Sequence, residues 1–249
     1  MKLAMMKRIG KTLIALGACF GFLMMLSAAE ANLHKKKNRD GVVYWHGDSA
    51  QNKIALTFDD GPQSVYTPQI LDILKKYNIK ATFFLIGKNV EVFPELAKRI
   101  KDEGHLIGKH TYDHPDLRLQ TRNQIKQQIQ KAEKAIIDAT GAKPYLFRPP
   151  YGFDNNLVLQ EAENSGYTII EWSVSGLNGR QDAPYNKIVK RVVDNTQNGS
   201  IILLHDGNRL SSRTDRSQIV KALPIIIETL QKKGYQFVTI DELLFEKGV

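Results

Sequence analysis

The feature that most constrains the fold is a regular alternation of short apolar runs with amphipathic stretches, which continues almost to the C-terminus. The apolar runs have the length and residue types of buried β-strands, and the stretches between them show the spacing of helices with one buried face. Strand followed by helix, repeated about seven times, is typical of a parallel sheet with crossover helices. The strands are expected at 54–58, 81–85, 106–108, 145–147, 168–172, 201–204 and 237–240.

Signals for helix ends support this pattern. Thr67-Pro68 and Phe93-Pro94 each place a proline where a helix can begin. Thr121 is suited to cap a helix that reaches Thr140, and Gly141 is suited to end it. Because no repeat or internal linker interrupts the alternation, we expect one α/β domain, best interpreted as a closed or nearly closed β/α barrel, with a doubly wound open sheet as the alternative. Further helices are expected at 155–165, 184–197 and 217–233.

The N-terminus has the pattern of a targeting segment. Basic residues between Lys2 and Lys11 precede an uncharged apolar run from Thr12 to Leu26. The segment Ala29-Glu30-Ala31 then favours cleavage after Ala31. The expected division is a signal peptide or membrane anchor at 1–31, a polar basic tether at 32–50 and the folded domain at 51–249.

Two alternatives to a cleaved signal remain open. Leu16-Gly17-Ala18-Cys19 resembles a lipoprotein processing site, which would put a lipid on Cys19, but the apolar run continues beyond this cysteine. The run from Thr12 to Ala29 is also long enough to span a bilayer uncleaved. All three interpretations place the domain beyond the cytoplasmic membrane. Because Cys19 is the only cysteine, we expect no disulfide framework.

The charge pattern narrows the class of partner. The formal net charge is +9, which suits an anionic cell-wall polymer and equally suits a merely soluble protein. No arginine-rich or aromatic-interleaved patch suggests nucleic-acid binding. The dense basic run His34–Arg39 is interpreted as part of the solvated tether.

Two adjacent carboxylates, Asp59 and Asp60, follow the expected strand at 54–58 and precede Gly61-Pro62. Side chains that diverge at such a bend allow one carboxylate to ligate a metal ion while the other faces the bound water. The alternative is an Asp-Gly turn with helix-capping acids.

Two histidines, His110 and His114, are four positions apart. If 111–113 form a helical turn, both imidazoles lie on one face and can bind one ion. With Asp60 they provide two nitrogens and one oxygen and leave a position open for water, as in a catalytic site. Ordinary structural histidines at this spacing are the alternative.

Two more polar residues follow expected strands. Arg148 begins the proline-stiffened loop Arg148–Gly152 and can hold a carboxylate ionised through a bidentate contact. His205 follows the strand at 201–204 and can give a proton to a departing amine. The alternatives are a rigid connector with a surface cation and a half-buried structural histidine. No site role is expected for the remaining histidines, His34, His46 and His105.

The chain contains, in this order, the segments Thr57–Gly61, His110–His114, Arg148–Gly152 and Leu203–His205. Their order and separations resemble the motifs of the NodB-homology polysaccharide deacetylases, carbohydrate esterase family 4. The similarity runs from about Lys53 to about Leu244. The resemblance implies a distorted β/α barrel, with 51–249 as the catalytic domain. It also implies Zn²⁺, or alternatively Co²⁺, Mn²⁺ or Ni²⁺, and a substrate such as peptidoglycan or chitin oligomers.

The resemblance also assigns roles to residues. The metal ligands are matched by Asp60, His110 and His114, and the general base is matched by Asp59. Arg148 matches the residue that orients this base.

On the other side of the reaction, His205 matches the general acid, and the backbone N–H of Tyr151 matches a donor to the oxyanion. Substrate contacts are expected from Pro149, Pro150, Tyr151, Trp172 and Leu203.

One position departs from the family pattern. The family usually has an aspartate followed by tryptophan after the strand that Trp172 closes, whereas this chain has Asn178 and Gly179. Asparagine can orient the imidazole of His205 but lacks the charge that raises the pKa of that ring. We therefore expect acid catalysis to weaken at alkaline pH.

The expected function is hydrolysis of N-acetyl groups on a cell-wall glycan, most simply peptidoglycan, with no nucleic-acid partner and a monomer favoured. Chitin oligomers, acetylated xylan or an exopolysaccharide are alternative substrates for the same chemistry. A weak or inactive glycan-binding homologue is the alternative of another class, suggested only by Asn178 and Gly179.

Overall fold

The computed structural model describes residues 43–152, 155–177, 183–210 and 214–245. These residues belong to a compact unit from Asn38 to Val249. The expected signal or anchor with Cys19, the basic run at 34–39 and the pair Asn178-Gly179 lie outside the described residues. Among the described helices, none combines the length and the apolar composition that crossing a bilayer requires.

The fold is built on one sheet in which every described strand pair is parallel. The strand order is β1-β6-β5-β4-β3-β2-β8-β7, and β9 pairs with β2. No pairing joins β1 to β7 in the described part of the chain, so the sheet is an incomplete, distorted barrel. The strands are β1 (Val43–Tyr44), β2 (Lys53–Asp59), β3 (Thr82–Leu85), β4 (Leu106–Lys109), β5 (Leu146–Phe147), β6 (Thr168–Ile170), β7 (Val174–Ser175), β8 (Ile201–His205) and β9 (Gln236–Phe237).

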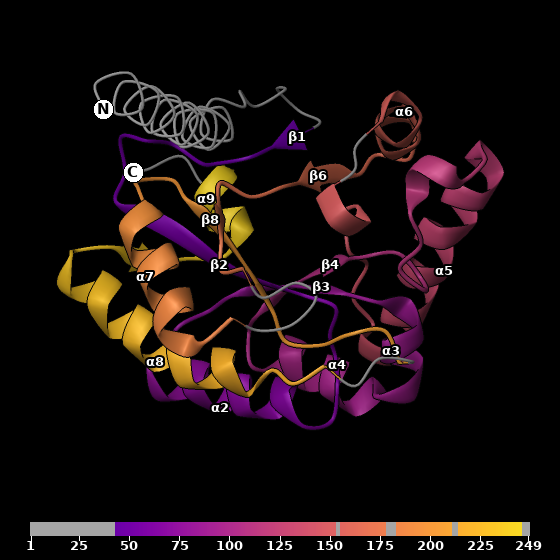
Figure 1. Cartoon of the computed structure of the whole chain (residues 1–249). Coiled ribbons are helices and arrows are strands. Elements are labelled where there is room, and N and C mark those ends of the chain that lie inside the picture. The colour runs from indigo at the N-terminus through magenta and orange to yellow at the C-terminus, as the bar shows by residue number, and fades with distance from the viewer. Residues whose placement is uncertain (1–42, 153–154, 178–182, 211–213, 246–249) are drawn as a thin grey trace, which may run out of the picture. The chain divides into compact units, whose positions relative to one another are not determined.

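Most of the helices cover the outer side of the sheet, as Figure 1 shows, whereas α9 packs on the inner side in a cluster with Ala55 and Ile201. Neighbouring helices pack in the order α7, α8, α2, α4, α5 and α6. The described α-helices are α2 (Tyr66–Lys76), α3 (Gly87–Val92), α4 (Pro94–Asp102), α5 (Arg122–Thr140), α6 (Asn156–Asn164), α7 (Tyr185–Asn195), α8 (Ser217–Lys232) and α9 (Ile240–Leu244).

The helix ends follow the chemistry expected from the sequence. The side chain of Thr121 accepts a hydrogen bond from the backbone N–H of Gln124, and the side-chain oxygen of Gln124 accepts one from the backbone N–H of Thr121, which forms a capping box at the start of α5. Gly141 ends this helix with a φ of 69°, in the left-handed region that favours glycine. Pro94 occupies the first turn of α4.

Three short elements differ from the sequence prediction. Val43–Tyr44 pair with β6, so the sheet includes residues that were assigned to a tether ending at 50. The expected strand at 237–240 ends at Phe237, because Thr239 caps α9 with a capping box. The two-residue strand β7 was not expected at all.

The alternation of side chains along β2 directs two polar groups to the inner side. Ile54, Leu56 and Phe58 are fully buried in the main core between the sheet and the outer helices. Thr57 and Asp59 point to the opposite face, where both accept hydrogen bonds from the same arginine. The strand therefore supplies core residues and site residues alternately.

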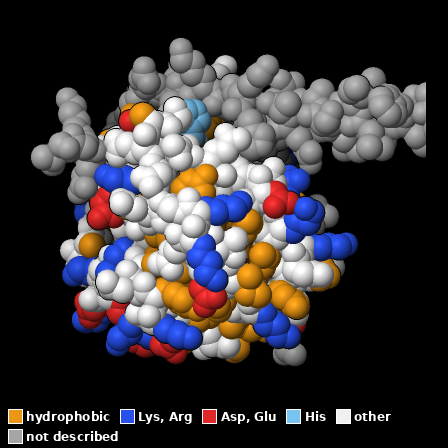
Figure 2. All heavy atoms as spheres, turned by 90° about the vertical axis from the view of Figure 1, so that its left-hand side faces the viewer, with side chains coloured by type: hydrophobic (Ala, Val, Ile, Leu, Met, Phe, Trp, Pro, Cys, Tyr) orange, Lys and Arg blue, Asp and Glu red, His pale blue; other side chains and the backbone are white. Residues whose placement is uncertain are grey.

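One face of the molecule shows charged and apolar side chains side by side. Figure 2 shows the face on the side of α7 and α8, where lysine, arginine and acidic side chains surround apolar ones. Tyr185 and Ile225 are among the exposed apolar residues, at 43% and 41% exposure.

Candidate metal and catalytic site

The polar groups that the sequence singled out meet at the carboxyl edge of the sheet. Asp59 is the last residue of β2 and lies opposite His205, the last residue of β8. His110 directly follows β4, and Arg148 directly follows β5. Because the carboxyl ends of parallel strands meet at one edge, these four separate segments converge on one cavity.

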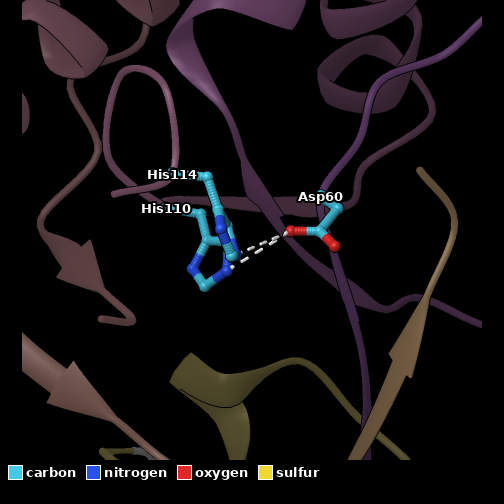
Figure 3. Close-up of side chains that lie close together, drawn as sticks. All are labelled: Asp60, His110 and His114. Carbon is cyan, nitrogen blue, oxygen red and sulfur yellow. Dashed lines mark ion pairs between the residues drawn. The ribbon is translucent and has the colours of Figure 1, made fainter. Parts of the chain in front are cut away.

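Three side chains form a group with the spacing of a metal site (Figure 3). One potential ligand atom from each of Asp60, His110 and His114 lies within 4.8 Å of the others, and all three residues are buried. Oδ1 of Asp60 is 3.5 Å from Nε2 of His110 and 3.3 Å from Nε2 of His114. Two imidazole nitrogens and one carboxylate oxygen are the donor set of catalytic zinc sites.

The buried oxygen at the centre of this group lacks a protein donor. Among the described residues, nothing donates a hydrogen bond to Oδ1 of Asp60. Burying a carboxylate oxygen without a partner is unfavourable, and a bound cation would remove that cost. The donor set therefore fits a divalent ion.

The two histidines converge without the expected helical turn. Thr111 and His114 have φ values of 66° and 61°, so the backbone between them bends instead of coiling. The hydroxyl of Thr111 accepts a hydrogen bond from the backbone N–H of His114 at 3.0 Å and stabilises this bend. The imidazole rings still lie close together, with centroids 4.9 Å apart.

Left-handed backbone is concentrated around the cavity. Asp60 and Tyr151, like the two residues in the histidine segment, have positive φ values, 72° and 65°. Such conformations cost about 1 kcal/mol or more for residues with a side chain. Four of them in one site indicate that side-chain placement is maintained at the expense of local stability.

The ring of His110 is oriented by a backbone carbonyl. Its Nδ1 donates a hydrogen bond to the carbonyl oxygen of Arg148 at 2.7 Å. Because a carbonyl can only accept, Nδ1 carries the proton, and the lone pair of Nε2 faces Asp60. This is the tautomer that a metal ligand requires.

The guanidinium of Arg148 fixes Asp59. It is fully buried and donates to Oδ1 of Asp59 at 2.7 Å and to Oγ1 of Thr57 at 2.8 Å. Two further N–H donors of the guanidinium bind the carbonyl oxygens of Ile170 and Glu171 at 2.8 and 3.0 Å. The carboxylate therefore has a single orientation.

Burial dominates the protonation of the two carboxylates. It raises the pKa of Asp59 to about 6, against the charge and hydrogen bond of Arg148, which lower it. Burial, followed by the negative charge of Asp59, raises the pKa of Asp60 to about 8. Both shifts show that this pocket disfavours two negative charges without an added cation.

The histidines are held in the neutral form. Burial lowers the pKa of His114 to about 4, and the charge of Arg209 acts in the same direction. Burial, and then the charge of His114, lowers the pKa of His110 well below its usual value. A neutral imidazole is the form that can bind a metal ion.

The side of the site that carries His205 is less enclosed. His205 is half-buried at the end of β8. Removal of the ring from water, and then the charge of Arg216, lowers the pKa of His205 well below its usual value. The ring is therefore mainly neutral at pH 7 unless a further negative charge lies beside it. Asn178, the position expected to supply that influence, lies outside the described residues.

These groups line a cavity of about 330 Å³. The ring of Tyr151 packs edge-on against His114, with centroids 4.7 Å apart. Pro149 and Pro150, which were expected to contact substrate, are buried and do not line the cavity. Besides the three residues in Figure 3, the cavity is lined by Asp59, Tyr151, Trp172, Ser175, Leu203, His205, Asn208 and Arg209.

Sequence reasoning missed two residues, Asn89 and Arg216, whose hydrogen bonds fix the loops of the site. The side-chain amide of Asn89 donates to the carbonyl oxygens of Asp60 and Asn208, both at 2.8 Å. Buried Arg216 donates to the carbonyl oxygen of Gly207 at 3.0 Å and to Oδ1 of Asn208 at 3.3 Å. Neither residue belongs to a motif, so only the folded arrangement reveals it.

The two described histidines without an expected site role lie outside the cavity lining. His105 is buried, and its Nδ1 accepts a hydrogen bond from the backbone N–H of Ala81 at 3.2 Å. The ring of His46 donates to the carbonyl oxygen of Gly47. Both contacts are structural.

Comparisons with known proteins agree with the motif pattern. Residues 46–170 match the family model described as polysaccharide deacetylase. A peptidoglycan-N-acetylglucosamine deacetylase of Bacillus cereus is 40% identical over 85% of this chain and 97% of its own length. The PgdA peptidoglycan-N-acetylglucosamine deacetylase of Listeria monocytogenes is 42% identical over 78% of this chain. The match covers only 39% of that relative's own length.

Solved structures show the same architecture. The Bc1960 peptidoglycan N-acetylglucosamine deacetylase superposes with a TM-score of 0.78 at 38% identity, over 83% of this chain and 94% of that one. BA3943 of Bacillus anthracis, described as a pseudoenzyme of carbohydrate esterase family 4, superposes with a TM-score of 0.76 at 31% identity, over 84% of this chain and 71% of that one. The chain therefore belongs to the polysaccharide deacetylase family, the NodB-homology group of carbohydrate esterase family 4.

Proposed function

We propose that this chain is a divalent-metal-dependent N-deacetylase that removes acetyl groups from N-acetylglucosamine units of peptidoglycan. The observation that carries the proposal is the convergence of Asp60, His110 and His114 within 4.8 Å. This group lines the same cavity as Asp59 and His205. A metal site beside a general base and a general acid can catalyse the hydrolysis of an amide.

The proposed metal ion is Zn²⁺, with Co²⁺, Mn²⁺ and Ni²⁺ as alternatives, held by Asp60, His110 and His114. When bound, it would polarise the acetyl carbonyl and lower the pKa of a water molecule. Imidazole and carboxylate donors suit these borderline cations better than Ca²⁺, which prefers oxygen ligands alone.

Asp59 is proposed as the general base that accepts a proton from the attacking water. Its pKa of about 6 keeps it mainly ionised at pH 7 and leaves it basic enough to take that proton. The hydrogen bond from Arg148 at 2.7 Å holds the carboxylate in position before the substrate arrives.

His205 is proposed as the general acid. The oxygen of water bonds to the acetyl carbon, the C–N bond breaks, and His205 gives the departing nitrogen its proton. The backbone N–H of Tyr151 is proposed to donate to the oxygen that gains negative charge during the attack. The products are acetate and a free amino sugar.

The cavity walls support a sugar substrate. Trp172, Leu203 and the exposed ring of Tyr151 offer apolar surfaces on which a sugar ring can pack. A bifunctional xylanase/deacetylase of Pseudobutyrivibrio xylanivorans is 41% identical over 82% of this chain, so acetylated xylan is an alternative substrate. Chitin oligomers and exopolysaccharides are the others.

The proposed place of action is outside the cytoplasmic membrane, where peptidoglycan lies. The apolar N-terminal segment supports export, either with cleavage or as an anchor in the cell envelope. A monomer is the proposed state.

The test is acetate release from purified peptidoglycan and from chitin oligomers, with the products identified by mass spectrometry. Protein treated with a chelator should lose activity and recover it with Zn²⁺. The Asp59→Asn variant should bind Zn²⁺ but release little acetate. If the zinc-loaded protein bound these polymers without releasing acetate, it would instead be an inactive glycan-binding homologue, comparable to the pseudoenzyme BA3943.

A further inference from the structure

We propose that Arg209 is a specificity-determining residue that binds a carboxylate on the glycan. The carboxylate is the lactyl group of the muramic acid unit next to the reacting N-acetylglucosamine, in a glycan strand from which the stem peptide has been removed. The proposal rests on the deacetylase function proposed above, and it names the feature that would make peptide-free peptidoglycan strands better substrates than peptide-bearing strands or neutral polymers. The observations that carry it are the position of Arg209, the contacts that fix it and the charges around it.

Arg209 lies where three hollows meet. It lines the main cavity, a neighbouring one of about 370 Å³ bounded by Phe93 and Thr214, and a third of about 290 Å³ bounded by Lys88. A glycan has repeating rings, so a polymer bound with one sugar in the main cavity must extend beyond it. The guanidinium therefore lies beside a path that units next to the reacting sugar can follow.

The backbone before Arg209 is fixed by buried side chains. Asn89 binds the carbonyl oxygen of Asn208 and that of Asp60, which links this loop to the metal-ligand segment. Arg216, fully buried, binds Gly207 and Asn208. The backbone at Arg209 is thus fixed in position relative to the proposed metal ligands.

The side chain itself is directed towards the site. Its Nη2 donates a hydrogen bond to the hydroxyl of Tyr151 at 3.3 Å, and the ring of Tyr151 packs on His114. One contact of this kind leaves further N–H donors of the guanidinium available. A planar guanidinium with adjacent free donors can bind a carboxylate through two parallel hydrogen bonds.

The charge of Arg209 is not neutralised by the described protein. No carboxylate in the described ranges forms an ion pair with it. It is also the sole lysine or arginine among the described residues that line the main cavity. Within the described ranges, Arg209 is therefore the cation that the mouth of the site presents.

This cation distinguishes among the candidate substrates. Chitin oligomers and acetylated xylan backbones carry no carboxylate that belongs to the acetylated chain itself. In peptidoglycan, N-acetylglucosamine alternates with muramic acid, whose lactyl carboxyl group forms an amide bond with the stem peptide and is a free carboxylate only where that peptide has been removed. A carboxylate next to the reacting sugar is what Arg209 can bind and what the neutral polymers lack.

The experiment compares three substrates of matched length. The first is a peptide-free peptidoglycan tetrasaccharide with free lactyl carboxylates, the second is the same compound with these carboxylates converted to methylamides, and the third is chitotetraose. The zinc-loaded protein should show a kcat/KM that is about 3–10-fold higher for the free acid than for the amide, as suits one partly solvated charged contact. Raising the salt concentration should reduce this ratio.

Substitution of the arginine then tests the assignment. Arg209→Gln should bring the ratio of acid to amide close to one, and Arg209→Lys should give an intermediate ratio because a charge without the planar fork remains. Lys126→Gln, which removes one exposed charge from the outer surface of α5, is the matched control and should keep the wild-type ratio. Circular dichroism should show the same fold for all variants.

The outcomes separate this inference from the proposed function. Acetate release with equal kcat/KM for acid and amide in the wild type would overturn the role of Arg209 and leave the deacetylase function intact. The role of Arg209 is likewise overturned if Arg209→Gln lowers kcat/KM equally for all three substrates, because the residue would then only maintain the site. Absence of acetate from every substrate would overturn the proposed function, and the inference with it.

Discussion

Two sides of the site are built differently: the base side, with the proposed general base Asp59, and the donor side, with the proposed general acid His205. On the base side, Asp59 and Arg148 are 2% and 0% exposed, and strands or their immediate ends carry both. On the donor side, His205 is half-buried and Arg209 is exposed. One side is fixed by sheet register and buried hydrogen bonds, whereas on the other side only His205 is carried by a strand, and Arg209 lies in the loop that follows it.

The difference teaches where variation can be tolerated. A buried carboxylate held by a buried guanidinium permits little change, because removing either partner leaves a charge without compensation. Loop residues at the cavity mouth can change with a smaller effect on folding. We therefore expect substitutions on the base side to abolish activity or stability, and substitutions on the donor side to adjust pH dependence and substrate choice.

The largest effect should come from Asp59→Asn. Asparagine preserves the shape and can accept the hydrogen bond of Arg148, but it cannot take a proton from water. We expect kcat to fall by about 10²–10⁴-fold, the usual contribution of a general base. Acetate release measures the loss, and zinc content by elemental analysis should remain unchanged. A fall of less than about threefold would show that the base side does not depend on Asp59.

The next effect should be the loss of stability in Arg148→Met. This change leaves Asp59 buried without its ion-pair partner and removes the donor to Thr57. We expect the free energy of unfolding at pH 7 to fall by about 3–5 kcal/mol, measured by chemical denaturation. Arg118→Met is the control, because its ion pair with Asp116 is on the surface and should contribute less than about 1 kcal/mol. Equal losses in the two variants would contradict the comparison.

A buried histidine outside the cavity separates the effect of burial from function. Burial lowers the pKa of His105 to about 4. Between its ordinary value and this one, the unfolded chain binds a proton that the folded chain does not, so stability is full above pH 6.5 and is lost as the pH falls towards 4.

The His105→Gln variant should lack this part of the pH dependence. Compared with it, the wild type should lose about 3 kcal/mol more between pH 7 and pH 4, as measured by denaturation at several pH values. Its kcat at pH 7 should equal that of the wild type. Parallel stability curves for the two proteins would mean that His105 is not responsible.

The smallest effect should come from Asn178→Asp on the donor side. A carboxylate near His205 would raise the pKa of this ring, which the surrounding protein and Arg216 lower. Because a general acid must be protonated, activity falls as the pH rises through that pKa, and raising it should move the basic limb of the pH–rate profile to higher pH. Identical basic limbs in the two proteins would contradict the idea.

Sequence reasoning succeeded where a residue's role depends on its own segment. The apolar run before Asp59 predicts a buried strand, and its end places the carboxylate at the cavity. Thr121 and Gly141 predict the ends of α5 because caps depend on local backbone geometry. The parallel α/β architecture is confirmed for the same reason, since strand and helix periodicity repeat along the chain.

Prediction from the sequence failed where contacts between distant segments determine the local structure. Strands β1 and β7 have two residues each, too few to show a period of two, and they exist because neighbouring strands pair with them. The bend at Thr111 replaces a helical turn because left-handed backbone cannot be inferred from a threonine. Asn89 and Arg216 bind loops distant in sequence, which no local pattern reveals.

Arg148 has a consequence for protein engineering. Its backbone carbonyl orients His110, and its guanidinium orients Asp59, so one residue aligns groups from two strands. A shift of the end of β5 would therefore misalign both groups together, and no single compensating substitution could restore them. Attempts to redirect this scaffold to other acetylated substrates should leave that strand end untouched and diversify the loop after His205.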